Sequence, residues 1–164
     1  MNTADDGRLR PATDADAAAV RAVVFDTLRE YGLSPDPEGA DRDLFALSSS
    51  YRDVGGAFAV LVTADDRVVG TVGLRPVDEP VAGESRTVEL RKMYLRPEFR
   101  GRGYGRVLFD WALAEARRMG FRRMTLETAT VLREAVRLYE RRGFRVVPHG
   151  PQVCRCDRVM ERDL

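Results

Sequence analysis

A glycine-rich turn, Gly101 to Gly105, separates a segment with the alternation of a strand from one with the periodicity of a helix. The strand is predicted over residues 87–95 and the helix over residues 106–119. Glycines let the backbone approach an anion closely, and the first N–H groups of a helix have no intrahelical partner. Three arginines surround the same turn: Arg100, Arg102 and Arg106. The turn is therefore predicted to bind a phosphate group.

The length of 164 residues suits one domain, so residues 1–164 are expected to form a single unit with residues 1–7 frayed. The formal net charge is only +1, which gives no bulk attraction to nucleic acid or to a membrane surface. We therefore expect neither as a partner. No apolar run approaches the roughly 20 residues that span a bilayer, and no signal segment is recognised.

Charge is unevenly distributed along the chain. Residues 91–106 carry six basic side chains and one acidic side chain, Glu98, whereas residues 1–43 carry ten acidic and five basic side chains. A basic cradle opposite an acidic segment would suit an anionic cofactor and a cationic acceptor. Lys92 is the only lysine, which we attribute to a codon bias towards arginine.

Cys154 and Cys156 are the two cysteines. Two positions apart on a strand, they point the same way but suit a disulfide poorly. No Cys-x-x-Cys motif or second pair is present, so we expect no metal site and no redox chemistry. A reducing, cytoplasmic compartment fits this usage.

The remaining pattern predicts the order of the other elements. A short strand begins at Leu9, and Thr13 is expected to cap a helix that ends at Gly32, with Asp16 as its capping-box partner. Further along we expect a helix over 41–51, strands over 57–63 and 68–74, a loop over 76–86, a strand over 122–127, a helix over 131–142 capped by Thr130, and strands over 144–147 and 154–161. This order predicts an α/β domain of the α+β type, with a largely antiparallel sheet, helices on both faces and one parallel pair joined by a right-handed crossover.

Two other phosphate-binding turns differ from this one. A dinucleotide-binding turn reads Gly-x-Gly-x-x-Gly and a P-loop ends in Gly-Lys-Ser/Thr, whereas residues 100–105 read Arg-Gly-Arg-Gly-Tyr-Gly. The alternative to phosphate binding is that the glycine-rich turn only connects the strand to the helix and binds no ligand.

The segment from Glu89 to Gly105 resembles the core motif of the GNAT superfamily of acyl-CoA-dependent N-acyltransferases. That signature is Arg or Gln, two residues, Gly, one residue, and Gly or Ala, and it is filled here by Arg100, Gly103 and Gly105. The match continues through 126–128 and 135–144, so two motifs stand in the family's order. The resemblance implies a mixed, largely antiparallel central sheet of six to seven strands, with about four helices on both faces.

The resemblance also implies how such a chain would bind acetyl-CoA. Backbone N–H groups of the turn would hold the pyrophosphate, Arg100 and Arg102 would add charge, and the strand edge would pair with the pantetheine arm like an added strand. A backbone N–H of that edge would polarise the acyl carbonyl. The residues expected to bind the cofactor are Met93, Tyr94, Leu95, Arg100, Gly101, Arg102, Gly103, Tyr104, Gly105 and Arg106.

Tyr139 stands where the family often places a tyrosine acid, four residues before Gly143. In that role it would protonate the departing thiolate. The alternative is core packing, because Tyr139 shares a helical stripe with Leu132, Ala135 and Leu138.

Glu89 is the candidate base that accepts the proton of the amine. By strand alternation Glu89, Arg91, Met93 and Leu95 are expected to share one face, and a buried glutamate can have its pKa raised enough for this task. The alternatives are a structural ion pair with a nearby arginine, and a proton relay through water alone.

Four further side chains carry weaker hypotheses. His149, the only histidine, lies in a Pro-Gly loop and is expected on the surface, and Trp111 is expected in the core. Asp41 and Asp43 would either attract a cationic acceptor or complement a helix dipole.

These observations together predict an N-acetyltransferase that transfers an acetyl group from acetyl-CoA to a primary amine, by direct attack in a ternary complex. No cysteine lies in the matched motifs, so a covalent acyl-enzyme is not expected. The acceptor is expected to be a small molecule and the protein a monomer or homodimer. The alternative is a catalytically silent acyl-CoA-binding module that senses the cofactor.

Overall fold

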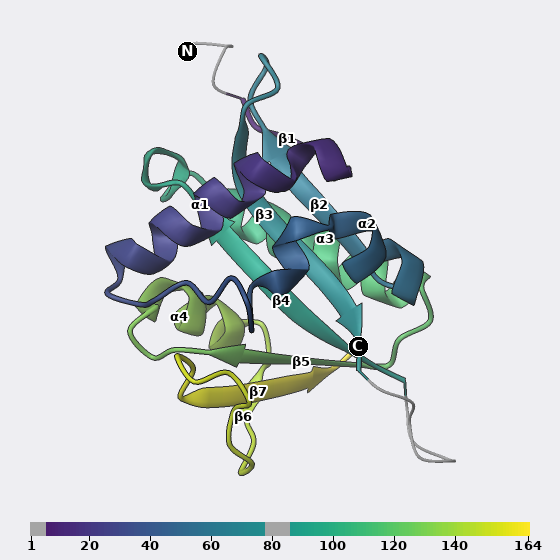
Figure 1. Cartoon of the computed structure of the whole chain (residues 1–164). Helices are drawn as coiled ribbons and strands as arrows, with labels where there is room; N and C mark the ends of the chain where they lie inside the picture. The colour runs from purple at the N-terminus through teal and green to yellow at the C-terminus, as the bar shows by residue number, and fades with distance from the viewer. Residues whose placement is uncertain (1–5, 78–85) are drawn as a thin grey trace.

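The computed structural model describes residues 6–77 and 86–164, which form a seven-stranded sheet in the order β1-β2-β3-β4-β5-β7-β6 (Figure 1). The strands are β1 (Arg8–Pro11), β2 (Ala57–Val62), β3 (Val68–Pro76), β4 (Thr87–Leu95), β5 (Arg123–Thr128), β6 (Arg145–Val146) and β7 (Arg158–Asp163). The α-helices are α1 (Ala17–Glu30), α2 (Leu47–Ser50), α3 (Tyr104–Arg118) and α4 (Arg133–Arg141). Short 3-10 turns are η2 (Asp14–Asp16), η3 (Arg42–Phe45), η4 (Arg52–Val54) and η5 (Pro97–Phe99). The predicted fold class is confirmed.

Strands pair antiparallel throughout the described sheet except for β4 and β5, which run parallel. The chain passes from β4 through the glycine turn and α3 before it enters β5, so the expected β-α-β unit is present. β2 and β3 form the predicted hairpin.

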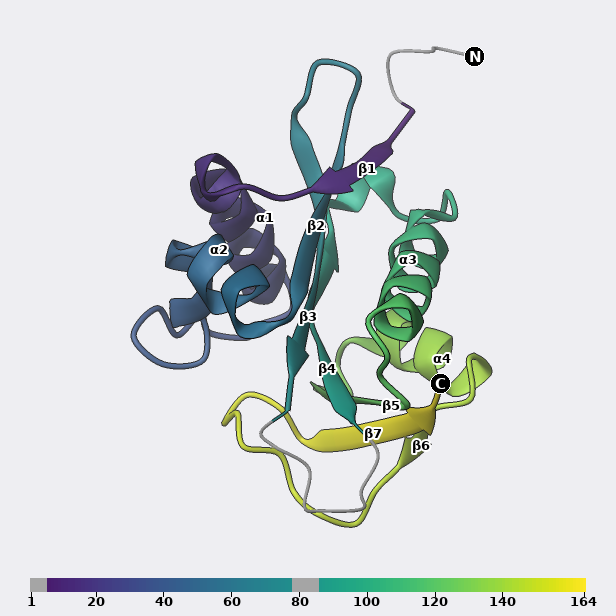
Figure 2. The ribbon, with the colours of Figure 1, turned by 90° about the vertical axis from the view of Figure 1, so that its right-hand side faces the viewer.

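Helices cover both faces of the sheet, with α1 and α2 on one side and α3 and α4 on the other (Figure 2). On the α1 side, Val20, Val24 and Leu28 are fully buried, because their spacing places them on one side of the helix. On the α3 side, Leu108 packs in a second buried cluster that includes Leu126 of β5. The sheet is thus packed between two helical layers, one on each face.

β4 and β5 pair only at their N-terminal ends, where residues 87–89 lie opposite residues 123–125. Beyond Glu89 the two strands separate, as the ribbon shows (Figure 1). The edge of β4 that faces β5 therefore has no partner strand among the described residues from Arg91 to Leu95.

A β-bulge interrupts β4 at Lys92, whose backbone φ is +52°. The register between β3 and β4 shifts there, so one more residue of β4 than of β3 lies between the paired positions. The expectation that Met93 and Leu95 share the face of Glu89 is therefore wrong, because an extra residue reverses the alternation. Met93 and Leu95 pack with the cluster on the α3 side, and Tyr94 packs with the α1 cluster.

The helix expected over residues 41–51 is broken into η3 and the short α2. Asp41 and Asp43 both bury their side chains, although residues two apart lie on opposite sides of an α-helix. A continuous helix could not have pointed both carboxylates inward, so the segment bends at Ala46, where φ is −147°.

Two predicted element ends also differ from the structure. β7 begins at Arg158 rather than Cys154, because residues 153–156 form a turn in which the Cys156 N–H donates to the Val153 carbonyl at 3.0 Å. α4 begins at Arg133, and the Thr130 hydroxyl donates to Asp157 at 2.8 Å rather than capping the helix.

The other boundaries agree more closely. The helix after the glycine turn begins at Tyr104, two residues earlier than expected. Before α1, the Asp16 carboxylate accepts a hydrogen bond from the Thr13 N–H at 2.8 Å, as the predicted capping-box partner does. Most of the loop expected over 76–86 lies outside the described residues. No helix in the described parts of the chain is long and apolar enough to cross a membrane.

Candidate active site

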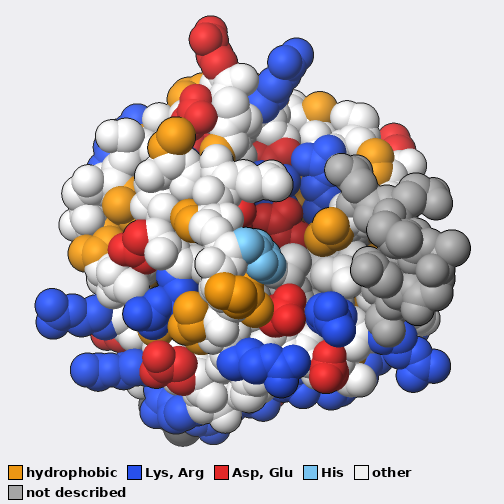
Figure 3. All heavy atoms as spheres, turned by 90° about the horizontal axis from the view of Figure 1, so that it is seen from below, with side chains coloured by type: hydrophobic (Ala, Val, Ile, Leu, Met, Phe, Trp, Pro, Cys, Tyr) orange, Lys and Arg blue, Asp and Glu red, His pale blue; other side chains and the backbone are white. Residues whose placement is uncertain are grey.

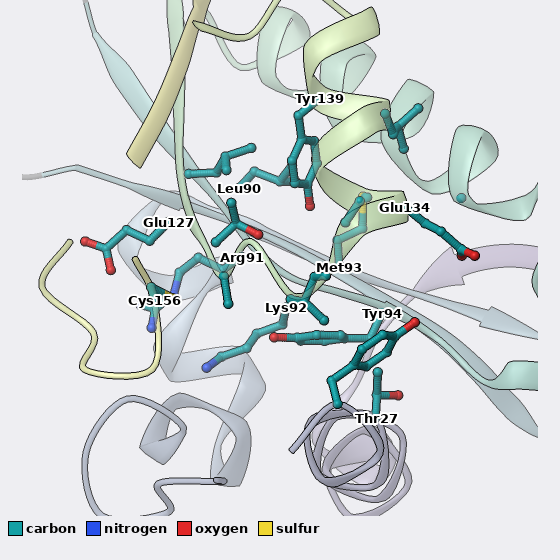
Figure 4. Close-up of a pocket in the computed structure, with 18 of the residues that line it drawn as sticks. Thr27, Leu90, Arg91, Lys92, Met93, Tyr94, Glu127, Glu134, Tyr139 and Cys156 are labelled. Atoms are coloured by element: carbon teal, nitrogen blue, oxygen red, sulfur yellow. The ribbon is translucent and has the colours of Figure 1, made fainter. Parts of the chain in front are cut away.

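A cavity of about 200 Å³ opens where β4 and β5 separate. Its walls come from β4, β5, α1, α3, α4 and the turn before β7 (Figure 4). Among the polar lining side chains are Glu89, Arg91, Tyr94, Glu127, Tyr139, Arg155 and Cys156. The fold thus brings the second half of β4 close to the face of α4 that carries Tyr139. The sequence predicted a role in acyl transfer for both segments but not that they line one cavity.

The glycine turn forms the N-terminal end of α3. Gly101 and Gly103 have φ values of +71° and +88°, which glycine adopts readily and other residues rarely do. The first intrahelical bond runs from the Val107 N–H to the Gly103 carbonyl, so the preceding N–H groups lie at the open end of the helix. A Cβ at either of these glycines would meet nothing within 4 Å, which means that open space lies beside the backbone.

The three arginines near the turn differ in their surroundings. Arg100 forms a two-point ion pair with Glu30, at 2.8 Å for each contact, and also donates to the Leu95 carbonyl. Arg102 and Arg106 are exposed, and the Arg102 guanidinium lies 5.5 Å from the centre of the Phe99 ring. The structure therefore directs Arg100 towards α1, while Arg102 and Arg106 stay at the surface beside the turn.

Tyr139 both packs in the core and faces the cavity. Its ring lies 6.2 Å from that of Phe109 and 5.7 Å from that of Phe144, and its side chain points from α4 towards β4 (Figure 4). Among the described residues its hydroxyl has no hydrogen-bond partner. Burial raises the pKa of Tyr139 above its ordinary value, with smaller contributions from Tyr94 and Cys156, so the phenol is protonated at neutral pH. It can therefore act as a proton donor.

Glu89 lies at the point where β4 leaves β5, and its side chain is 28% exposed. Burial raises the pKa of this carboxyl, the Arg91 guanidinium opposes the rise, and the Glu127 carboxylate adds to it. Arg91 Nε lies 4.0 Å from the Glu89 carboxylate. The structural alternative, an ion pair with a nearby arginine, is thus present, but it is long and leaves the carboxyl facing the cavity.

Two further polar groups line the cavity on the side away from α3. Burial raises the pKa of the Tyr94 phenol to about 12 and that of the Cys156 thiol to about 11, so both are protonated and neutral at pH 7. The face that carries the 148–157 segment shows acidic and basic side chains close together around the single histidine (Figure 3).

Asp41 and Asp43 play neither of the roles expected from the sequence. Both are buried rather than displayed to an acceptor, and each lies within ion-pair distance of Lys92. Asp41 also binds Arg155, and Asp43 accepts a hydrogen bond from the Tyr51 hydroxyl. A helix dipole is not involved, because no regular α-helix begins there.

Sequence reasoning missed Lys92, Arg155, Glu127 and Cys156 as residues of the site. The one available signal was the single lysine of an arginine-rich chain, placed within a strand that is otherwise half apolar. His149 is exposed and Trp111 packs against the core, as expected. Within residues 6–77 and 86–164 no group of acidic, histidine or cysteine side chains has the arrangement of a metal site.

Comparison with known proteins places this geometry in context. The sequence model of the acetyltransferase (GNAT) family matches residues 22–144. The chain is 38% identical over 144 residues to the uncharacterized N-acetyltransferase YjgM of Escherichia coli K12. This alignment covers 87% of this chain and 84% of that protein.

Solved structures share the fold. A GNAT-family acetyltransferase of Staphylococcus aureus Mu50 superposes with a TM-score of 0.86 at 19% identity, over 96% of this chain and 99% of that one. The phosphinothricin acetyltransferase of Sinorhizobium meliloti, solved in complex with acetyl-CoA, superposes with a TM-score of 0.69 at 22% identity, over 96% of this chain and 88% of that one.

The family match runs from α1 through β4, the glycine turn and α4, and so includes every element that lines the cavity except the turn before β7. The chain belongs to the acetyltransferase (GNAT) family.

Proposed function

We propose that this protein transfers an acetyl group from acetyl-CoA to a primary amine, by direct attack of the amine in a ternary complex. The observation that carries the proposal is the separation of β4 from β5, which opens a cavity lined by both Tyr139 and Glu89. A proton donor and a proton acceptor in one cavity, beside an unpaired strand edge, are what acyl transfer to an amine requires.

The glycine turn supports the cofactor assignment. Gly101 and Gly103 leave open space beside the backbone at the N-terminus of α3, where partial positive charge favours a pyrophosphate. The exposed Arg102 and Arg106 add charge at the same end. Acetyl-CoA bound to a relative of the same fold, the Sinorhizobium meliloti enzyme, also favours this cosubstrate.

The free edge of β4 would hold the acyl end. Among the described strands none pairs with residues 93–95 on the β5 side, so their backbone groups can pair with the amides of a pantetheine arm. One N–H of this edge would donate to the acyl carbonyl and stabilise negative charge on its oxygen. Acetyl-CoA would supply a thioester whose acyl carbon bonds to the amine nitrogen while the bond to sulfur breaks and a thiolate departs.

Two side chains would carry the protons. Glu89 accepts a proton from the amine, directly or through water, because the neutral amine is the nucleophile. Tyr139 donates its hydroxyl proton to the departing sulfur and is then reprotonated from solvent. Burial of Tyr139 keeps it protonated until that step, and burial of Glu89 makes its carboxylate a stronger base than an exposed one.

The acceptor would be a small molecule. The cavity volume of about 200 Å³ admits a compact group, and the carboxylates of Glu89 and Glu127 favour a cationic amine. We also propose that the protein is a monomer or a homodimer. We also propose that residues 1–164 act as one domain, and the two free cysteines favour a reducing, cytoplasmic setting.

Calorimetric titration with acetyl-CoA tests the cofactor, with dephospho-CoA and ATP as controls. We expect micromolar binding of acetyl-CoA and much weaker binding of ATP. An amine panel read by release of free thiol then tests catalysis. Binding without thiol release from any amine would favour a silent acyl-CoA-binding module, and no binding by the folded protein would refute the proposal.

A further inference from the structure

Lys92 occupies an unusual point of β4. Its φ of +52° lies in the left-handed region, which is unfavourable for a residue with a Cβ, and it stands where the register of β3 and β4 shifts. Asp66, the other described non-glycine residue with positive φ, lies in the exposed turn between β2 and β3. Lys92 instead lies inside the sheet, so its surroundings must hold it in this conformation.

Both the backbone and the side chain of Lys92 are fixed. Its carbonyl accepts a hydrogen bond from the Thr71 hydroxyl at 2.6 Å. Its Nζ donates to the Ala40 carbonyl at 2.8 Å and to Asp41 Oδ1 at 2.5 Å. The side chains of Lys92 and Asp41 are only 4% and 0% exposed. A buried ion pair with additional hydrogen bonds holds a long side chain in one position.

Asp41 joins Lys92 to two other segments. Its carboxylate accepts hydrogen bonds from both terminal nitrogens of Arg155, at 2.6 and 2.8 Å, and from the Asp36 N–H at 2.8 Å. Arg155 belongs to the turn before β7 that lines the cavity. One buried carboxylate thus connects the bulge of β4 with the turn before β7.

The bulge decides which side chains and backbone groups of β4 face the cavity. Without the extra residue, alternation would continue and Met93 would lie on the face of Arg91. With it, Met93 turns towards the α3 side while Lys92 points away to Asp41 (Figure 4). The orientation of residues 93–95 along the free edge, which we assign to the acyl group, therefore depends on the bulge.

We propose that Lys92 is a positioning residue for acyl transfer: its pair with Asp41 holds the bulge so that a backbone N–H of residues 93–95 meets the acyl carbonyl. This inference rests on the proposed function. Lys92 touches no reacting atom and acts through the backbone. Its side-chain contacts run to Ala40, Asp41 and Asp43 and away from the glycine turn, so breaking the pair leaves the pyrophosphate site in place.

The test is the infrared carbonyl band of acetyl-CoA labelled with ¹³C in the acetyl carbonyl. Bound to the natural protein, this band shifts to lower frequency, because an N–H donates to the carbonyl. In Lys92→Met most of the shift is lost, while the Kd for acetyl-CoA changes by no more than about threefold. Lys92→Arg, which keeps the charge, restores part of the shift.

Two further variants separate the ion pair from general damage. Arg96→Met is the matched control, since Arg96 follows β4 but pairs with the exposed Asp26, and it keeps the full shift. In Lys92→Gly the glycine adopts the same φ without strain but has no Nζ, so this variant should also lose the band shift. It replaces Lys92→Met in the test if Lys92→Met does not fold.

A folded Lys92→Met or Lys92→Gly variant with the full band shift overturns the inference. So does a natural protein that binds acetyl-CoA with no band shift at all. A natural protein that does not bind acetyl-CoA refutes the proposed function instead, so the two failures are distinguishable.

Discussion

Arg100 and Glu30 form a two-point ion pair, with both contacts at 2.8 Å, that joins the residue before the glycine turn to the C-terminal end of α1. The same guanidinium donates to the Leu95 carbonyl at the end of β4. Arg100 is the first residue of the family signature, yet its hydrogen-bonding groups are directed at protein rather than at the open end of α3. Its position therefore favours a role in fixing the end of β4 relative to α1.

Glu30→Gln tests this interpretation. The pair is partly exposed, so the free energy of unfolding should fall by less than about 1 kcal/mol. Acetyl-CoA affinity should stay the same or weaken, because Arg100 loses an anchor. If affinity instead rises clearly in calorimetric titration, the released guanidinium is binding the cofactor, and the positioning role is wrong.

Tyr139→Phe keeps the aromatic packing with Phe109 and Phe144 and removes only the hydroxyl. We expect kcat to fall by about 100-fold, the contribution of a general acid, with little change in the Kd for acetyl-CoA. Tyr94→Phe removes a second phenol from the same cavity and should lower kcat much less. Steady-state thiol release measures both, and equal losses in the two variants would contradict the specific role of Tyr139.

Glu89→Gln should change the pH dependence of kcat/KM. In the natural protein the carboxyl must lose its proton to act as a base, so activity rises with pH through a pKa that burial places above the ordinary glutamate value. The glutamine variant should be slower and lack this acidic limb. Glu98→Gln, at the exposed end of the same segment, should keep the natural profile. An unchanged acidic limb in Glu89→Gln would assign the base to another group or to water.

Gly103→Val and Gly105→Ala should differ in their effect on the stability of the protein, although both glycines belong to the family signature. Gly103 has φ +88°, so valine should destabilise the fold by about 1–2 kcal/mol and weaken acetyl-CoA binding. Gly105 has ordinary helical geometry and only Leu95 nearby, at 3.9 Å from an added Cβ, so alanine should leave stability unchanged or raise it by up to about 1 kcal/mol. Urea unfolding and calorimetric titration measure these effects, and a fully stable, binding-competent Gly103→Val would contradict the turn geometry.

Asp41 should make stability depend on pH at the acidic end. Burial alone would raise its pKa, but the hydrogen bond from Arg155 and the charge of Lys92 outweigh burial and lower the pKa to about 2. Because the folded pKa lies below the unfolded one, this contribution is fully present above about pH 4 and is lost as the pH falls towards 2, amounting to about 2 kcal/mol.

Urea unfolding between pH 7 and pH 2.5 measures that contribution. Asp41→Asn should be less stable at pH 7 by about 3 kcal/mol, because Arg155 loses its counter-ion and Lys92 keeps only the pair with Asp43 at 3.5 Å. Its stability should also fall less on acidification. Asp53→Asn, which alters an exposed pair with Arg52, should keep the natural slope. Parallel slopes for the two asparagine variants would show that Asp41 does not titrate as proposed.

Local patterns predicted much of the fold. The stripe of Val20, Val24 and Leu28, the hairpin of β2 and β3, and the glycine turn ahead of α3 all follow from short-range periodicity and turn chemistry. The helix expected at residues 41–51 was wrong, because long-range ion pairs of Asp41 and Asp43 override the local helical preference of that segment.

The sequence by itself determined the order of elements, the glycine turn and the family signature, because these depend on residues that are neighbours along the chain. Only the tertiary structure decided that β4 carries a bulge at Lys92, that β4 and β5 separate after Glu89, and that Tyr139 faces the resulting cavity. The physical reason is distance along the chain. Lys92 meets Asp41 across about fifty residues, and a contact between such distant residues leaves no local pattern to read.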